Sequence, residues 1–229
     1  FHQRGQLTPR ERLAQLLDQG MPFLEIYNMA NFLVEDLDPE TSVPGASSIS
    51  GIGFIKGIRS MILVNDSGIN AGATTTTSVT KALGCLKMAN RQNLPFIQLV
   101  ESAGANLMNY TVELWAHGGG MFYGLAKLSA KGLPTVVVLH GPSTAGGAYQ
   151  PGMSDYVIGV KNNGMAALGG AALVMAATGE MADERELGGT EMHAKTSGLV
   201  EFLAEDDAHG VAMARDLIGR LDWNKGLNS

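Results

Sequence analysis

Two segments rich in small residues constrain the fold of this chain more than any other feature. Each follows an apolar run that is typical of a buried strand, Leu94–Val100 for the first and Leu133–Leu139 for the second. The segments themselves are Glu101–Leu107 and Gly141–Met153, and the second continues into an apparent helix. Apolar strands that alternate with helices are typical of an α/β protein with a largely parallel sheet. The carboxyl ends of parallel strands share one edge of the sheet, so both segments are expected to lie there.

The rest of the chain continues this alternation. A helix is predicted to begin after Thr8, because Thr8 is a good N-cap, Pro9 suits the first helical position and Glu11 completes a capping box. Gly20 is expected to end this helix, and the polar segment Glu35–Ser48 is expected to form a loop. The other expected elements are a hairpin of Ile49–Ile55 and Ser60–Asn65 joined by residues 56–59, helices Thr77–Gln92, Thr111–Ala130, Ala171–Thr178 and Asp207–Leu221, and strands Asp155–Val160 and Gly198–Leu203.

The composition is that of a well-buried globular protein, which we interpret as one domain spanning residues 1–229. Apolar residues make up 45% of the chain and charged residues 17%. The net charge of −6 argues against nucleic acid as a partner, because phosphate binding needs a basic face. No apolar run is long enough to span a bilayer. The single cysteine, Cys85, excludes an intrachain disulfide and a cysteine-based zinc cluster, and it favours a reducing compartment.

The two segments favour chemistry carried out by the backbone. The first amides of a helix have no acceptor within the helix, so they point outward at its N-terminus. Small side chains let a ligand atom approach such amides within hydrogen-bond distance. Two of these turns side by side would form an oxyanion hole that stabilises an enolate or a similar developing negative charge.

The second segment is open to three other interpretations. Gly141–Ala145 nearly matches the nucleophile elbow of hydrolases, with Ser143 as nucleophile, although the fifth position is Ala instead of Gly. Its possible partners, Asp155, His193 and His209, show no spacing that would assemble a triad. The Ala145–Ala148 run could instead serve only the close packing of a helix on the sheet. A phosphate-binding nest is a weaker alternative, because the segment lacks the spacing of known phosphate-binding loops.

Six motifs in register give the chain a resemblance to a known family. They are Arg4–Leu13, Ile49–Gly57, Glu101–Leu107, Thr144–Asp155, Ala176–Glu180 with Leu187–Gly189, and His193–Gly198. Together they resemble the N-terminal domain of the carboxyltransferase β subunits of biotin-dependent acyl-CoA carboxylases, above all the methylcrotonyl-CoA and propionyl-CoA types. This family lies within the crotonase/ClpP superfamily, so the resemblance implies a crotonase-like spiral of ββα units. The match covers nearly the whole chain.

The resemblance implies a reaction that fits the backbone cradle. In this family a carboxyl group moves from carboxybiotin to an acyl-CoA, which passes through an enolate on the thioester oxygen. The oxyanion glycines of the family map to Gly146 and Gly147, and Ala103 and Gly104 form the opposing wall. By the same resemblance, Ala145, Ala148 and Tyr149 contribute to cofactor or substrate binding. No metal is expected, and the proton is thought to leave to biotin, so no side-chain base is required.

The resemblance also implies partners that the chain itself does not supply. Biotin is expected on a separate carrier domain or subunit, together with a biotin carboxylase. Family active sites form against the C-terminal carboxyltransferase domain of another subunit, which is absent from this sequence. The chain begins with Phe1 and ends at Trp223–Ser229, so we expect a piece of a longer polypeptide or a subunit that needs a partner. A homo-oligomer in the cytoplasm, or in the mitochondrial matrix of a eukaryote, is the corresponding expectation.

Three further functions remain as alternatives. A biotin-dependent decarboxylase or transcarboxylase subunit would share the two turns. A crotonase-type hydratase or isomerase would need a side-chain acid, for which Glu113, one helical turn from His117, is the first candidate. A catalytically silent assembly domain would have no accessible pair of amides. His140, at a strand end, is interpreted as a structural histidine, and Lys87 is rejected as a biotin attachment site because its surroundings are helical.

Several small residues depart from the family pattern. Thr74–Thr77 stands where relatives carry larger or more varied residues, and Ala171–Ala172 replaces a common proline-containing turn. Gly118–Gly120 lies inside a helical pattern, at a cost of about 1 kcal/mol per Gly relative to Ala, and is predicted to break the helix. We hypothesise that these small residues create an unusual acyl pocket.

Overall fold

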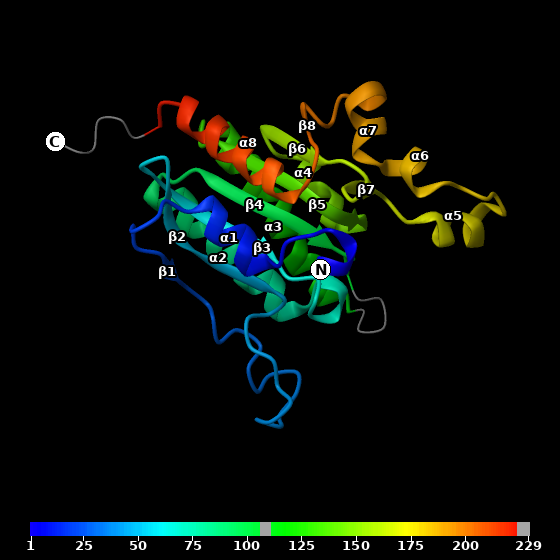
Figure 1. The fold of residues 1–229 in the computed structure, drawn as a ribbon. Coiled ribbons are helices and arrows are strands. Elements are labelled where there is room, and N and C mark those ends of the chain that lie inside the picture. The colour runs from blue at the N-terminus through cyan, green and yellow to red at the C-terminus, as the bar shows by residue number, and fades with distance from the viewer. Residues whose placement is uncertain (106–110, 224–229) are drawn as a thin grey trace.

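The computed structural model describes residues 1–105 and 111–223, which form one eight-stranded sheet flanked by helices (Figure 1). The strand order is β1-β2-β3-β4-β5-β6-β8, and β7 pairs with the far end of β5. The first three strands pair antiparallel and all later pairs are parallel, which confirms the predicted α/β fold with a largely parallel sheet. The strands are β1 Leu24–Glu25, β2 Ser48–Ile55, β3 Ile58–Asn65, β4 Phe96–Ser102, β5 Thr135–Thr144, β6 Tyr156–Val160, β7 Met165–Ala167 and β8 Phe202–Ala204.

Helices cover both faces of the sheet. In Figure 1, α1 (Pro9–Leu16) and α8 (Asp207–Arg220) lie side by side in front of it, and α2 (Thr76–Gln92) and α3 (Val112–Ala130) lie behind. Alternate residues of a strand serve the two faces, as Val136 and Val138 pack in the core beneath α1 and α8. The remaining helices are short: α4 Tyr149–Gly152, α5 Ala171–Thr178, α6 Glu184–Gly188 and α7 Thr190–Met192.

The N-terminal helix begins as its sequence predicts and ends earlier. Thr8 accepts a hydrogen bond from the Glu11 amide, and the Glu11 carboxylate accepts one from the Thr8 amide, so the predicted capping box is present. The helix ends at Leu16, four residues before Gly20, because Leu17 adopts an extended conformation. Gly20 instead lies in the following turn with a φ of 78°.

Three strand boundaries differ from the prediction, each for its own reason. The hairpin turn consists only of Lys56 and Gly57, since Ile58 already pairs with Ile55. Strand β5 continues five residues beyond the predicted end at Leu139, because its last residues pair with β7. The predicted strand Gly198–Leu203 begins only at Phe202, since a helical turn continues to Ser197 and Gly198 closes it with a φ of 75°.

The glycine run in α3 does not break the helix, contrary to the prediction. Residues Val112–Ala130 are continuously helical. Gly120 and Gly124 lie against α2, where a Cβ built on Gly124 would be 2.8 Å from Leu86 Cδ1. Gly118, in contrast, has open space where a Cβ would lie. Two of the α3 glycines therefore bring the two helices close together, and the preceding turn presents bare backbone.

Cys85 is a buried core residue of α2, as predicted, and burial raises the pKa of its thiol to about 11. None of the helices in the described part of the chain is both long and apolar enough to cross a membrane. The last predicted feature, Trp223–Ser229, lies outside the described residues from position 224 onward.

Candidate active site

The two small-residue segments lie side by side at the carboxyl ends of β4 and β5. Ser102 pairs with Ser143 in the parallel register of these strands. Beyond them, Thr144 Oγ1 donates a hydrogen bond to the Ala103 carbonyl at 2.9 Å. Gly104 has a φ of 77°, and a Cβ built on it would lie 2.7 Å from the Thr144 carbonyl oxygen. The first turn therefore rests directly on the second, while Asn106 and Leu107 at its end lie outside the described residues.

The second segment turns through a short 3₁₀ helix, Ala145–Ala148, before α4 begins. Ala145 has a φ of 50°, and its amide donates to the Leu168 carbonyl at 3.0 Å. The Gly146 amide follows it in the first turn, where the 3₁₀ pattern provides no acceptor. The third amide is that of Gly147. In the 3₁₀ pattern it points towards the carbonyl three residues earlier in the chain, so it is less available to a ligand. Gly146 is thus the better placed donor for a ligand.

The two glycines have different surroundings. A Cβ built on Gly146 would meet no atom within 4 Å, so this residue borders open space. A Cβ built on Gly147 would lie 3.1 Å from Ser143 Oγ and 3.4 Å from Ser102 Cβ, so Gly147 packs on the strand ends. The backbone of Gly147 therefore holds the turn against the strand ends, and the backbone of Gly146 borders the open space beside the turn.

A cleft lies between this turn and helix α3. It is open to solvent, and its walls are mainly apolar. Gly118 and Gly119 of α3 lie across from Gly146 and Gly147, and Trp115 and Phe122 extend the same wall. The first segment contributes Ala105 to the lining. Ala103 is exposed and Gly104 is buried beneath Thr144, so these two support the second turn without reaching the cleft.

Of the residues that follow Gly147, Gln150 lines the cleft and Tyr149 contacts its lining residue Phe122. Tyr149 is 49% exposed, and its ring centroid lies 4.2 Å from that of Phe122 with the rings tilted by 31°. Ala148 is half-buried against the core under the turn. Gln150 is 6% exposed and borders the cleft, a position that our sequence analysis missed. The sequence signal for it is a polar residue one helical turn after Gly146.

The hydrolase interpretation fails on geometry. Ser143 Oγ is buried and has no hydrogen-bond partner among the described residues. Asp155 accepts hydrogen bonds from Thr135, His193 contacts the Ala166 carbonyl at 2.7 Å, and His209 lies near the Glu205 amide. The three expected partners are each engaged elsewhere, so the described structure assembles no triad around Ser143.

The remaining titratable candidates lie away from the cleft. His117 contacts Thr80 Oγ1 at 3.2 Å, and both His117 and Glu113 are exposed on α3. Lys87 is exposed on α2. His140 is fully buried, which lowers its pKa, and its Nδ1 lies 2.9 Å from the Asp207 carboxylate, as expected of a structural histidine. No cluster of three or more potential metal ligands occurs within residues 1–105 and 111–223.

Comparison with known proteins identifies the family to which the chain belongs. The family model of the carboxyl transferase domain matches residues 1–228. A probable biotin-dependent acyl-coenzyme A carboxylase β2 subunit of Mycobacterium tuberculosis is 42% identical over 228 residues, which are 98% of this chain and 41% of that protein. This chain therefore spans about two fifths of the length of that relative.

Two solved structures share the fold. The β subunit of P. aeruginosa geranyl-CoA carboxylase is 45% identical, with a TM-score of 0.89 over 98% of this chain and 41% of that one. Transcarboxylase 12S, described as a hexamer with methylmalonyl-coenzyme A bound, is 29% identical, with a TM-score of 0.85 over 95% of this chain and 42% of that one. The fold is thus the crotonase-like fold of carboxyltransferases, and the chain belongs to the carboxyl transferase domain family.

Proposed function

We propose that this chain forms the acyl-CoA half of the carboxyltransferase site in a biotin-dependent acyl-CoA carboxylase. The observation that carries the proposal is the position of Gly146 in the first turn of a 3₁₀ helix, beside a mainly apolar cleft. The first amides of a helix have no acceptor within it, so the Gly146 amide is available to a ligand. A thioester oxygen placed against this amide would gain a hydrogen bond that strengthens as negative charge develops. Removing one such donor typically lowers kcat by roughly 100- to 1000-fold.

The described residues suit this chemistry without a side-chain base. The Gly146 amide binds the thioester oxygen, Gly147 holds the turn on the strand ends, and the Ala103–Gly104 segment fixes the turn from the other side. Ala145 anchors the start of the turn through the Leu168 carbonyl, and Ala148 anchors its far side in the core. Tyr149 packs on Phe122, which lines the cleft.

Biotin would approach the open side of the same turn. A Cβ built on Gly146 would meet no atom within 4 Å apart from its chain neighbours, so the turn is open on that side. When carboxylated, biotin supplies the carboxyl group that is transferred. We place biotin on a separate carrier domain or subunit that works with a biotin carboxylase.

The assembly is proposed from the relatives. A C-terminal carboxyltransferase domain of another subunit would complete the site within a homo-oligomer, in line with the hexamer of transcarboxylase 12S. A reducing compartment, the cytoplasm or the mitochondrial matrix, fits a chain whose single cysteine is buried and unpaired.

The cleft favours a long or branched acyl group. Gly118 and Gly119 leave open space where side chains would otherwise narrow the cleft, and Thr74 also lines it. The relative with 45% identity is a geranyl-CoA carboxylase, whose named substrate has a long branched acyl chain. This supports the hypothesis that the small residues create an unusual acyl pocket.

The test uses the complete carboxylase with ATP and bicarbonate and compares propionyl-, methylcrotonyl- and geranyl-CoA. We expect carboxylated products, with the highest kcat/KM for the longest branched substrate. The Gly119→Leu variant would fill the cleft and reduce that preference, whereas Gly152→Ala, in open space outside the cleft, would not. A strong preference for propionyl-CoA in the unmodified enzyme would contradict the acyl pocket, and a lack of any carboxylated product would contradict the function.

A transcarboxylase or decarboxylase is the second candidate, because transcarboxylase 12S shares the fold and 29% of the residues. The same cradle would stabilise the same enolate in either direction. Product formation that requires a carboxylated acyl-CoA donor, and not ATP with bicarbonate, would favour this candidate.

A further inference from the structure

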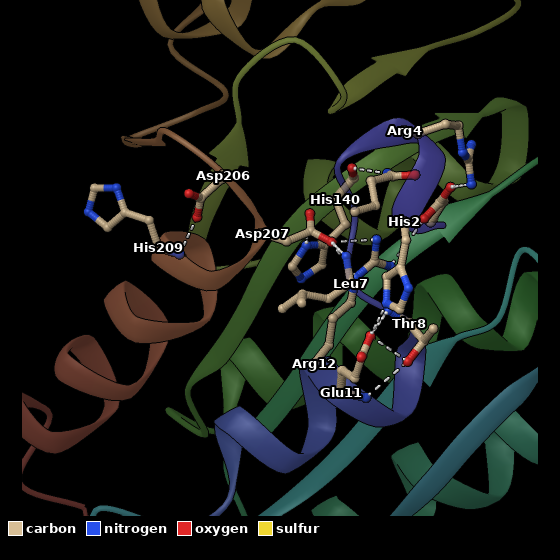
Figure 2. Close-up of polar contacts among 12 residues, drawn as sticks. His2, Arg4, Leu7, Thr8, Glu11, Arg12, His140, Asp206, Asp207 and His209 are labelled. Carbon is tan, nitrogen blue, oxygen red and sulfur yellow. Dashed lines mark hydrogen bonds and ion pairs between the residues drawn. The ribbon is translucent and has the colours of Figure 1, made fainter.

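A buried cluster of charged and polar side chains lies directly behind the two turns. Figure 2 shows Arg12 from α1, His140 from β5 and Asp207 from the start of α8 close together. Glu101 from β4 joins them through its hydrogen bond with Arg12. The side chains of Arg12, Glu101, His140 and Asp207 are 0%, 3%, 0% and 2% exposed. Such burial is rare for charged groups unless each of them is paired.

Arg12 joins the two halves of this cluster. Its Nη1 donates to Glu101 at 3.1 Å, and its Nε donates to Asp207 at 2.8 Å. The other oxygen of Asp207 lies 2.9 Å from His140 Nδ1. Burial alone would raise the pKa of Asp207, but the hydrogen bond with His140 and the charge of Arg12 outweigh it and hold that pKa below its ordinary value. One guanidinium thus connects Glu101, near the end of β4, through Asp207 with His140, which lies inside β5.

Both strands continue from the cluster into the turns of the candidate active site. Glu101 is followed by Ser102, Ala103 and Gly104, and His140 is followed by the stretch that ends in Gly146. Glu101 also packs on the backbone after His140, because a Cβ built on Gly141 would lie 2.6 Å from its Cδ. If one strand moved relative to the other, the contact between Gly104 and Thr144 would change. The Gly146 amide, two residues after Thr144, would then move as well.

The segment before α1 completes the cluster from outside. Arg4 donates to the second Glu101 oxygen at 3.3 Å, and the guanidinium groups of Arg4 and Arg12 lie 5.5 and 5.6 Å from the centroid of the Phe1 ring. Gln6 Nε2 donates to the His140 carbonyl at 3.0 Å, and the Leu7 amide donates to Asp207 at 2.9 Å. Residues 1–12 thus cross the ends of both strands and bind each of them.

We propose that Arg12 is a positioning residue for the proposed carboxyltransferase. By binding Glu101 and Asp207 at once, it holds the last part of β4 and the His140 segment of β5 in the relative position that aims the Gly146 amide at the thioester oxygen. The proposal rests on the proposed function, since it assigns Arg12 a role in the placement of that donor. A misplacement of about 1 Å at a catalytic contact can cost about 100-fold in rate.

The test compares Arg12→Gln with Arg10→Gln in the complete carboxylase. Arg10 lies on the same helix, but its side chain is 62% exposed and pairs with Glu25 at 2.7 Å, so it matches the change in charge without touching the cluster. Acyl-CoA binding sites are counted by calorimetry, and kcat is expressed per binding site. We expect Arg12→Gln to lower kcat by about 10- to 100-fold with little change in KM, because an oxyanion donor acts mainly in the transition state.

A purely structural role gives a different result. It would reduce the number of binding sites and leave kcat per site unchanged, and that outcome overturns the proposal. If Arg12→Gln fails to assemble, Arg12→Lys decides, because lysine keeps the positive charge but lacks the forked donors that bind Glu101 and Asp207 at once. We then expect a smaller fall in kcat per site, again without a rise in KM, and an unchanged kcat per site overturns the proposal. Absence of carboxylation by the unmodified enzyme would instead refute the proposed function.

Discussion

Gly104 and Gly146 occupy adjacent turns, and they require glycine for different reasons. Gly104 combines a φ of 77° with a distance of 2.7 Å between a built Cβ and the Thr144 carbonyl oxygen. Both the backbone conformation and the packing there exclude a side chain. Gly146 has neither restriction, and the lack of a side chain instead leaves its amide accessible to a ligand.

A Gly104→Ala substitution tests the structural half of this distinction. We expect the free energy of unfolding to fall by about 1–3 kcal/mol, because alanine is strained at a positive φ and its methyl group would push against the second turn. Denaturant unfolding of the subunit measures the change. Gly152→Ala is the matched control, since a Cβ there meets no atom within 4 Å. Equal stability of Gly104→Ala and the control would refute the account of the Gly104 contact.

At the scale of the elements, the glycines of α3 have two roles: some allow close packing against α2, and others leave the cleft open. Gly124 faces Leu86 of α2, whereas Gly118 borders the cleft with no atom near a built Cβ. Gly118→Ala is therefore expected to raise the free energy of unfolding by about 0.5–1 kcal/mol through helix propensity. Gly124→Ala is expected to show no such rise in the free energy of unfolding, because its methyl group would collide with the Leu86 side chain. Urea unfolding of both variants provides the measurement, and an equal gain in both would contradict the assigned packing.

The elements that were predicted well carry local signals, and those predicted poorly depend on distant partners. The capping box at Thr8 and the 17-residue helix α2 follow from neighbouring residues alone. The extension of β5 to Thr144 depends on β7, some twenty residues later in the sequence, so the polar stretch after Leu139 gave no strand signal. The continuity of α3 through its glycines likewise depends on contact with α2, which no helix propensity records.

At the scale of the whole molecule, the candidate site was predictable as a pair of turns and not as a cleft. The positions of Gly146 and Gly147 after an apolar strand indicate a backbone donor from sequence. The opposite wall comes from α3, and the support behind the turns joins Arg12 to Asp207 across almost the entire chain. Contacts of this kind arise only when the sheet brings residues from both ends of the sequence together.

The central claim is that the Gly146 amide polarises the thioester of a bound acyl-CoA. Infrared difference spectroscopy with acyl-CoA labelled with ¹³C at the thioester carbonyl tests it most directly, in the complete carboxyltransferase assembly. The Gly146→Pro variant, with its fold verified by circular dichroism, lacks the amide hydrogen. We predict that the labelled carbonyl band moves to lower wavenumber on binding to the unmodified protein and returns towards its solution value in the variant. A bound band that stays at the solution value, or a shift that survives Gly146→Pro, would contradict the account.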